Sequence, residues 1–511
     1  MSNAPPARAA SLLASAHAAL RRGDELPAEM AYRQALAAGA GAVARLGLGM
    51  ALARQLRPRE ARAELLAAAS ELPRQLKGAA LADALTELAA TLVELHAEAD
   101  AQKPLERALK LVPTAARAHH LHAQALARAG LPAAALAAAR RAHTLAGAGA
   151  SNAAILLATL EGRQGQPDAA LARLAAIAQD DPNHARARFE MARLADARGD
   201  YLAAFALLRE AGACARRAPA GAAFDLDAVH RELAADAALA ADWPFSATPD
   251  DALPAPAFLL GFYRSGTTLI EQILAGHPAV LGSDEADLVP WVLRALARET
   301  RLPWAEALRQ GGEPLRRGLR ERYWARARQL FGAEPERRLL LDKTALNSVN
   351  LAFIHALFPE ARIVFVARDP RDACVSTFMQ ALRPNALSAQ FLDWERGVRF
   401  YVAVARHALS LREYLPLAWL TLRYEDVLDD YRGAAERALV HLGLGWDDAV
   451  ADYRRGAAAR RLSTPSREAV TEPLNRHAVG RWRRYAFAFS DTERAQLAPV
   501  LDALGYPGWD D

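Results

Sequence analysis

Three glycines in the first half of the chain are almost evenly spaced. Gly130, Gly165 and Gly199 lie 35 and 34 residues apart, and each precedes a Leu, Gln or Asp and then a helical run. A small residue at a turn between two amphipathic helices, repeated about every 34 residues, is typical of helical arrays. One such repeat cannot bury its hydrophobic face alone, so the pattern predicts that neighbouring repeats stack into a solenoid.

Other segments extend this repetition over residues 1–240. The stretch 51–58 (ALARQLRP) is echoed about two repeats later by 125–132 (ALARAGLP), and residues 185–215 form the best copy. The pattern resembles the tetratricopeptide repeat. That resemblance implies an all-α scaffold that binds a partner and carries no catalytic residues. An alanine-rich helical array of another kind is the alternative.

The pattern changes after a proline-rich segment. Residues 241–256 hold four prolines and predict a linker. From 257 to 511, long helical stretches alternate with short apolar runs, which are Ala257–Gly261, Leu339–Leu341, Ile363–Ala367 and Ala418–Leu422. Strands that alternate with helices predict a three-layer α/β domain built on a parallel sheet.

Composition narrows the classes of partner. The 63 basic and 59 acidic residues give a net charge of only +4, and no basic block with interleaved aromatic residues indicates nucleic-acid binding. Cys214 and Cys374 form neither a disulfide framework nor a metal-ligand motif. No apolar stretch approaches the roughly 18 residues that span a bilayer. We therefore expect a cytoplasmic protein without a membrane span or a bound metal.

A glycine-bounded loop follows the first predicted strand. Residues 261–268 read GFYRSGTT and run into an apolar helical stretch, an arrangement that directs backbone N–H groups and a helix dipole at an anion. The glycine spacing is that of a nucleoside-triphosphate loop, but Thr267 follows the second glycine where that loop has lysine. Because a triphosphate needs the lysine, the loop favours a nucleotide with a single 5′-phosphate.

With the following residues, LIEQILAGHP, this loop resembles the 5′-phosphosulfate loop of sulfotransferases that use 3′-phosphoadenosine-5′-phosphosulfate (PAPS). It is most similar to the tyrosylprotein sulfotransferase branch and to bacterial proteins that join tetratricopeptide repeats to such a domain. Most of these have proline in place of Tyr263. The resemblance implies a P-loop-like PAPS site formed by Arg264, Ser265, Gly266, Thr267 and Thr268, with Arg264 also beside the transferred group.

A second motif covers residues 363–376, IVFVARDPRDACVS. Asp369 is a good N-cap for the following helix, Pro370 suits its first position, and Asp372 stands where a capping-box acid would. Arg368 therefore leaves a strand at its carboxyl end, where open α/β sheets bind ligands. The family holds the 3′-phosphate with an Arg and a Ser eight residues apart, which Arg368 and Ser376 match.

Two later segments complete the resemblance. Tyr424, in the sequence RYED, matches a tyrosine that lies by the nucleotide. Residues 463–482 resemble the loop that folds over the nucleotide, and Ser466 matches its serine near the sulfate. The tyrosylprotein relatives often have a basic residue where this chain has Glu472, a carboxylate that cannot bind phosphate.

Two residues are candidates for the chemistry. Lys343 is the last of four lysines in a chain that otherwise uses arginine, and a compact ammonium at a strand end suits a departing oxygen. Glu285 matches the family's catalytic glutamate, which acts as the base for the acceptor hydroxyl. Asp284, His277 and His355 are the rival bases.

The sequence thus predicts a PAPS-dependent sulfotransferase in which Glu285, Lys343 and Arg264 are catalytic. PAPS is the co-substrate, 3′,5′-adenosine bisphosphate (PAP) is its product, and no metal is expected. The acceptor is left open among tyrosine of a peptide or protein, which the repeats would hold, another phenol, and a glycan hydroxyl. The alternatives are a P-loop kinase-like phosphotransferase and a catalytically inert repeat scaffold.

Overall fold

The computed structural model describes residues 7–147, 149–218, 223–240, 243–245, 249–454 and 476–509. The chain divides into two compact units, Met1–Glu190 and Met191–Asp511. The division falls inside helix α11 (His184–Ala197). The structure therefore groups the last predicted repeat helices with the residues that follow them.

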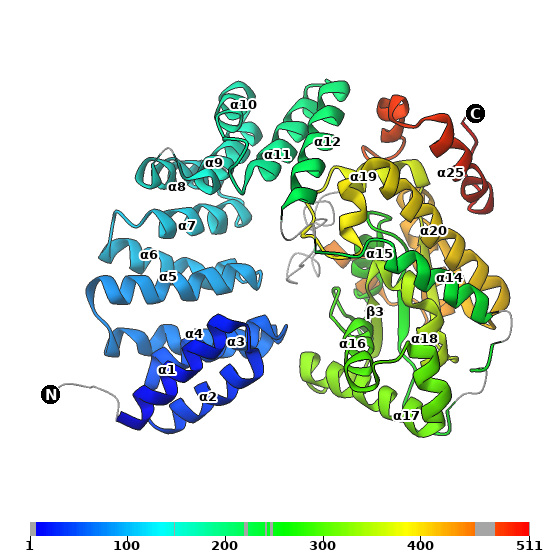
Figure 1. The fold of residues 1–511 in the computed structure, drawn as a ribbon, viewed down its shortest axis with the longest axis horizontal. Helices are drawn as coiled ribbons and strands as arrows, with labels where there is room; N and C mark the ends of the chain where they lie inside the picture. The colour runs from blue at the N-terminus through cyan, green and yellow to red at the C-terminus, as the bar shows by residue number, and fades with distance from the viewer. Residues whose placement is uncertain are drawn as a thin grey trace. The chain divides into compact units, whose positions relative to one another are not determined.

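The first unit is all-α, as the repetition predicts. Successive helices pack side by side in pairs, and Figure 1 shows α1 to α10 as a stack of such pairs. The helices are α1 (Ala7–Arg22), α2 (Glu25–Ala37), α3 (Gly41–Arg54), α4 (Pro58–Gln75), α5 (Gly78–Glu94), α6 (Glu98–Leu111), α7 (Ala116–Arg128), α8 (Pro132–Ala146), α9 (Ser151–Arg163) and α10 (Pro167–Ala175).

Alanine and leucine fill the core between these helices. Ala68, Ala89 and Ala108 are fully buried at helix contacts, where a small side chain lets two backbones approach closely. The evenly spaced Gly130 and Gly165 have φ of 73° and 74°, a left-handed conformation that glycine adopts without steric cost. The predicted helix turns are confirmed.

The second unit is built on five parallel strands in the order β2-β3-β1-β4-β5. The strands are β1 (Ala257–Leu260), β2 (Val280–Gly282), β3 (Leu339–Lys343), β4 (Arg362–Ala367) and β5 (Ala418–Arg423). All four predicted strands are present, and β2 is a short additional edge strand.

Helices cover both faces of this sheet, so the predicted three-layer fold is confirmed. Leu259 of β1 packs into a cluster with residues of α15 and α22, whereas its neighbour Phe258 contacts Phe358 after α18 on the other face. Figure 1 shows the helices around the sheet. They are α15 (Thr267–Leu274), α16 (Val289–Thr300), α17 (Trp304–Phe331), α18 (Leu351–Leu357), α19 (Pro370–Phe378), α20 (Trp394–Tyr414), α21 (Tyr424–Asp429), α22 (Tyr431–His441) and α25 (Asp491–Ala503).

Two helices that precede the sheet in sequence pack directly on this unit. They are α12 (Tyr201–Arg217) and α14 (Ala228–Ala240). On α12, Phe205 makes edge-to-face contact with Trp394, with ring centroids 5.5 Å apart. A Cβ at Gly212 would lie 2.2 Å from the carbonyl oxygen of Leu392. At Gly212, α12 therefore approaches the backbone of Leu392 more closely than any side chain would allow.

Within the part of the chain that the structure describes, every helix is too short or too polar to span a bilayer.

Gly212→Ala should destabilise the second unit, because the added methyl meets backbone that cannot rotate away. We expect a loss of about 1–3 kcal/mol in the free energy of unfolding. Gly318→Ala in α17 is the control, since no atom lies within 4 Å of the point that a Cβ would occupy there, and alanine at that position should stabilise the helix by about 1 kcal/mol. Denaturant melts of both variants test this, and equal stability would contradict the close packing of α12.

Candidate functional site

The predicted site residues follow the carboxyl ends of all five strands. Parallel pairing brings these ends to one edge of the sheet, where open α/β folds bind ligands. One candidate follows each strand: Arg264 after β1, Glu285 after β2, Lys343 at the end of β3, Arg368 after β4 and Tyr424 after β5. The segments that follow β2, β3, β4 and β5 thereby lie at the same edge of the sheet as the phosphate loop, which follows β1.

The phosphate loop has the backbone that an anion-binding turn needs. Gly266 has φ of 99° and directly precedes α15, so the positive end of the helix dipole points toward the loop. Ser265 donates to the carbonyl of Phe262 at 2.8 Å, which fixes the turn. Thr267 and Thr268 are buried in the first turn of α15.

The two predicted halves of the nucleotide site touch each other. Nε of Arg264 lies 3.3 Å from Oγ of Ser376, to which it donates. Arg368 donates to the carbonyl oxygen of Arg264 at 2.7 Å, and its guanidinium lies 5.1 Å from the ring centroid of Tyr424. A Cβ on Gly266 would be 2.3 Å from that same ring. Glycine is therefore required there by space as well as by φ.

Glu285 and Lys343 are joined by backbone and side chain. The backbone N–H of Glu285 donates to the carbonyl of Lys343 at 3.0 Å, and Lys343 Nζ donates to Glu285 Oε1 at 3.1 Å. The side chain of Lys343 is 0% exposed, whereas that of Glu285 is 42% exposed. The ammonium of Lys343 is thus buried, and the carboxylate of Glu285 is partly open to solvent.

Backbone strain gathers at these residues. Arg264, Asp284 and Glu285 have φ of 62°, 48° and 61°, in the left-handed region that residues other than glycine rarely adopt. Such residues cost energy and cluster at active and ligand-binding sites. The strained residues thus lie in the phosphate loop and in the turn after β2, at the edge where the sequence predicts the site.

Residues 256–448 match the model of the sulfotransferase family. This segment is a sulfotransferase-family domain. An uncharacterized protein of Aquifex aeolicus is 28% identical over 260 residues, which are 49% of this chain and 32% of that protein. Protein-tyrosine sulfotransferase 2 of Gallus gallus is 23% identical over 266 residues, which are 49% of this chain and 68% of that protein. The chain thus spans about a third of the first relative and about two thirds of the second.

Among solved structures, the sulfotransferase domain of the Synechococcus PCC 7002 olefin synthase is similar to part of the chain. It is 21% identical, with a TM-score of 0.35, and the match covers 51% of this chain and 98% of that domain.

The sulfotransferase domain contains an acid that the sequence reasoning missed. Glu271 on α15 is fully buried. Its Oε2 lies 3.3 Å from Lys343 Nζ, and its Oε1 accepts from the backbone N–H of Asp284 at 2.7 Å. A carboxylate in the apolar stretch LIEQIL was the available signal, because a buried charge needs a partner.

Lys343 is therefore held between two carboxylates. Burial alone would lower its pKa, but Glu271, Glu285 and Asp284 raise that pKa to about 12. The pKa of Glu271 is raised, because the effect of burial exceeds the opposing effect of the Lys343 charge. The lysine is a permanent cation at neutral pH.

The rival bases are differently placed. His355 lies in α18, where burial and then Arg316 lower its pKa to about 4. His277 accepts from the backbone N–H of Ala279 at 3.0 Å through Nδ1, which ties it to the turn after α15. The third rival, Asp284, donates its backbone N–H to the carboxylate of Glu271. Tyr263 of the phosphate loop is not a rival base, but burial and then the charge of Glu285 raise the pKa of its hydroxyl.

Asp372 has a different role from the predicted capping box. Asp369 does cap α19 by accepting from the N–H of Arg371 at 2.9 Å. Asp372 instead accepts from the backbone N–H groups of Gly480 and Trp482 at 2.7 and 2.8 Å. Burial raises its pKa to about 6 against the opposing charge of Arg368. The contact joins two segments that lie about 110 residues apart in the sequence, so local spacing could not predict it.

Ser466 and Glu472, which the sequence analysis compared with the loop over the nucleotide, lie outside the described residues.

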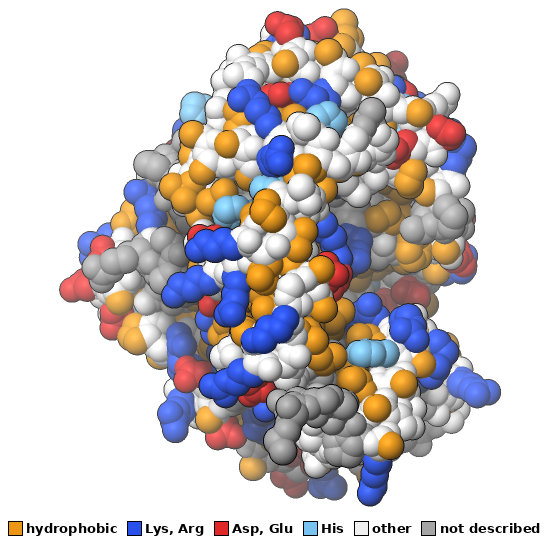
Figure 2. Space-filling view, turned by 90° about the vertical axis from the view of Figure 1, so that its left-hand side faces the viewer, with side chains coloured by type: hydrophobic (Ala, Val, Ile, Leu, Met, Phe, Trp, Pro, Cys, Tyr) orange, Lys and Arg blue, Asp and Glu red, His pale blue; other side chains and the backbone are white. Residues whose placement is uncertain are grey.

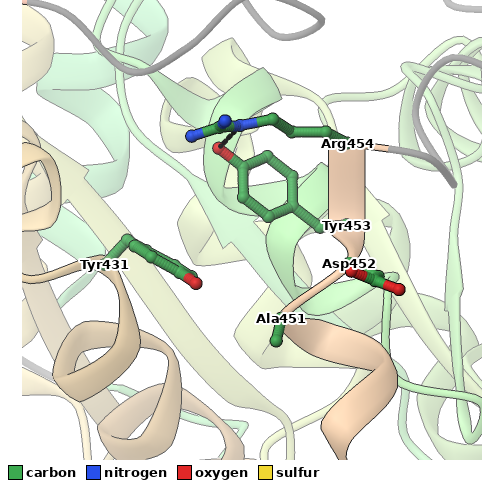
Figure 3. A pocket seen from close by; sticks show the side chains of 5 residues that line it. All are labelled: Tyr431, Ala451, Asp452, Tyr453 and Arg454. Atoms are coloured by element: carbon green, nitrogen blue, oxygen red, sulfur yellow. Dashed lines mark hydrogen bonds between the residues drawn. The ribbon is translucent and has the colours of Figure 1, made fainter.

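A pocket of about 340 Å³ lies away from these residues, lined by Tyr431, Ala451, Asp452, Tyr453 and Arg454. Figure 3 shows Arg454 turned onto the hydroxyl of Tyr453, to which its Nε donates at 3.4 Å. None of the predicted site residues lines it. Across the described ranges, no group of His, Cys, Asp or Glu side chains is arranged to hold a metal ion.

Glu271→Gln should lower the pKa of Lys343, because burial persists while the carboxylate that raises it most is lost. The chain has only four lysines, so selective ¹³Cε-lysine labelling gives a readable NMR titration. Glu285→Gln is the matched comparison and should lower the pKa less, since that carboxylate is partly exposed. A larger effect from Glu285→Gln would show that Glu271 is not the main counter-charge.

Proposed function

We propose that the chain transfers a sulfuryl group from PAPS to a hydroxyl acceptor. Glu285 is the base, and Arg264 and Lys343 stabilise the leaving oxygen. The observation that carries this proposal is the contact between Glu285 and the fully buried Lys343, 3.1 Å apart. It stands at the sheet edge that also holds the phosphate loop.

The residues present fit the nucleotide. The loop from Arg264 to Thr268 and the start of α15 would hold the 5′-phosphosulfate through backbone N–H groups and hydroxyls. Arg368 and Ser376 would hold the 3′-phosphate, since a guanidinium and a hydroxyl supply directed donors. Arg264 contacts Ser376 at 3.3 Å, so both ends of the ligand fall within one cluster of donors.

The reaction needs a proton acceptor on one side of sulfur and cations on the other. The acceptor oxygen forms a bond to sulfur as its proton passes to Glu285. The bond from sulfur to the bridging phosphate oxygen breaks, and that oxygen leaves with the electron pair as part of PAP. Charge develops on the leaving oxygen in such loose transition states. Preorganised cations lower the barrier without rearranging, which is the proposed task of Lys343 and Arg264.

A kinase-like reaction is the second candidate and is less well supported. Thr267 occupies the place of the lysine that grips the β- and γ-phosphates in triphosphate loops. Lys343 does not stand in the place of that lysine, because it lies at the end of β3 and not in the loop between β1 and α15. An inert scaffold would not need a strained turn to present Glu285.

For the acceptor we favour a tyrosine in a protein or peptide, held by the helical repeats, over another phenol or a glycan. The chicken relative is by name a protein-tyrosine sulfotransferase. Figure 2 shows one side of the molecule, where blue basic side chains lie among orange hydrophobic ones, with red acidic side chains between them. A mixed surface of this kind suits a peptide that carries both acidic and apolar side chains.

Nucleotide binding should depend on the 3′-phosphate and on no metal. PAP should raise the melting temperature equally with and without a chelator, and ATP–Mg²⁺ should raise it much less. Arg368→Ala should weaken PAP by about 1.5–3 kcal/mol, as expected for a charged hydrogen-bond partner, and leave adenosine 5′-monophosphate nearly unchanged. Calorimetry with both ligands measures this. Stronger stabilisation by ATP–Mg²⁺ would favour the kinase-like reaction, and equal weakening of both nucleotides would make Arg368 structural.

Glu285→Gln and Lys343→Ala should fail in different ways. The first variant cannot accept a proton, so turnover should fall by about two to four orders of magnitude and recover partly with more acidic phenols. The second variant has its defect on the leaving-group side, so acidic phenols should rescue it far less. Turnover across substituted phenols distinguishes the two. Wild-type turnover of Glu285→Gln with a weakly acidic phenol would return Asp284 and the histidines to consideration.

A further inference from the structure

The backbone of residues 478–482 is hydrogen-bonded to two residues at the proposed nucleotide site. Asp372 accepts from the backbone N–H groups of Gly480 and Trp482, and Arg368 donates to the carbonyl oxygen of Ala478. Arg368 is the residue proposed to bind the 3′-phosphate. The position of backbone 478–482 therefore helps to set the position of that guanidinium.

Side chains of the same segment are hydrogen-bonded to helix α11, which the sequence assigns to the repeats. Asp196, near the end of α11, accepts from Arg481 through one carboxylate oxygen and from the hydroxyl of Tyr485 through the other at 2.6 Å. The side chain of Asp196 is 15% exposed and that of Arg481 is 27% exposed. A largely buried carboxylate that accepts through both oxygens should stabilise the contact more than a solvent-exposed ion pair would.

Aromatic contacts reinforce this attachment. Tyr201, at the start of α12, packs edge-on against Tyr485 with ring centroids 5.5 Å apart. Phe205, one turn further, packs edge-on against Phe487 at 5.7 Å. The pair α11–α12 therefore grips the short helix Arg481–Ala488 at several points, and Asp196 is the charged contact among them.

Arg481 also belongs electrostatically to the site. Burial lowers the pKa of Arg264, and the charges of Arg368 and Arg481 lower it further. A third cation thus lies within reach of the two proposed to bind the nucleotide. Without a fixed counter-charge, Arg481 would be free to move relative to them.

We propose that Asp196 is a positioning residue for the nucleotide. By holding Arg481 and Tyr485, it fixes the segment whose Ala478 carbonyl and Asp372-bound backbone orient Arg368. This inference rests on the proposed function, and it places a determinant of nucleotide affinity outside the matched family segment 256–448. Helix α11, which the sequence assigns to the repeats, then contributes to the nucleotide site through Asp196.

The test compares Asp196→Ala and Asp196→Asn with a control at the same helix interface. Glu395→Gln breaks the ion pair with Arg209 of α12, and that pair lies outside the segment 478–485. Asp196→Ala should weaken PAP about three- to tenfold, and Asp196→Asn should weaken it less because the amide oxygen still accepts a hydrogen bond. Glu395→Gln should bind PAP as the wild type does. In the two Asp196 variants, the affinity for adenosine 5′-monophosphate should fall less than the affinity for PAP.

Kinetics and coupling separate positioning from general support of the fold. In Asp196→Asn, the KM for PAPS should rise while kcat stays near the wild-type value, since no reacting atom is touched. The loss of PAP affinity in the double variant Asp196→Ala/Arg481→Ala should be smaller than the sum of the two single losses, because both changes remove the same ion pair.

Unchanged PAP affinity in a folded Asp196→Ala protein would overturn the inference, as would additive losses in the double variant. Equal losses for both nucleotides would reduce Asp196 to a structural residue. These outcomes are distinct from failure of the proposed function, in which the wild-type protein itself would not bind PAP.

Discussion

Parallel pairing of five strands is the constraint on which the rest of the second unit depends. Because all strands point the same way, residues that are 160 positions apart along the chain, such as Arg264 and Tyr424, end at one edge of the sheet. Parallel strands require crossover connections, which are usually helical. The helices that bury the two faces are therefore a consequence of the same pairing. The phosphate loop and the candidate base are products of connection geometry as much as of residue choice.

Charge is the second organising feature, and it centres on one buried cation between two carboxylates. Lys343 is fully buried and is flanked by buried Glu271 and partly exposed Glu285. A buried cation is tolerated only with counter-charge, since an unpaired ion in the interior is costly. Lysine, with its compact ammonium, fits between two carboxylates where the broader guanidinium of arginine would need a planar partner. This accounts for a single lysine in a region that otherwise uses arginine.

Much of this architecture could be predicted because its signals are local. The glycine turns, the four apolar strands and the N-cap at Asp369 each follow from a few neighbouring residues. The short strand β2 was missed because only two of its three residues are apolar and the third is glycine. Glu271 and Asp372 were missed or misjudged because their partners lie far away in sequence. Glu271 meets Lys343, and Asp372 meets Gly480, only after the chain has folded. Tertiary contacts of this kind leave no spacing to read.

The close approach of Gly212 to the backbone at Leu392 has a consequence for how such proteins can be recombined. Helix α12 is part of the catalytic unit in packing, although its sequence follows the repeat pattern. A foreign repeat array grafted at the proline-rich segment would replace α12 and expose the aromatic surface around Trp394. A functional chimera has to be joined before residue 191, so that the native α12 travels with the sheet. By packing, α12 therefore belongs with the sheet, although its sequence continues the repeat pattern.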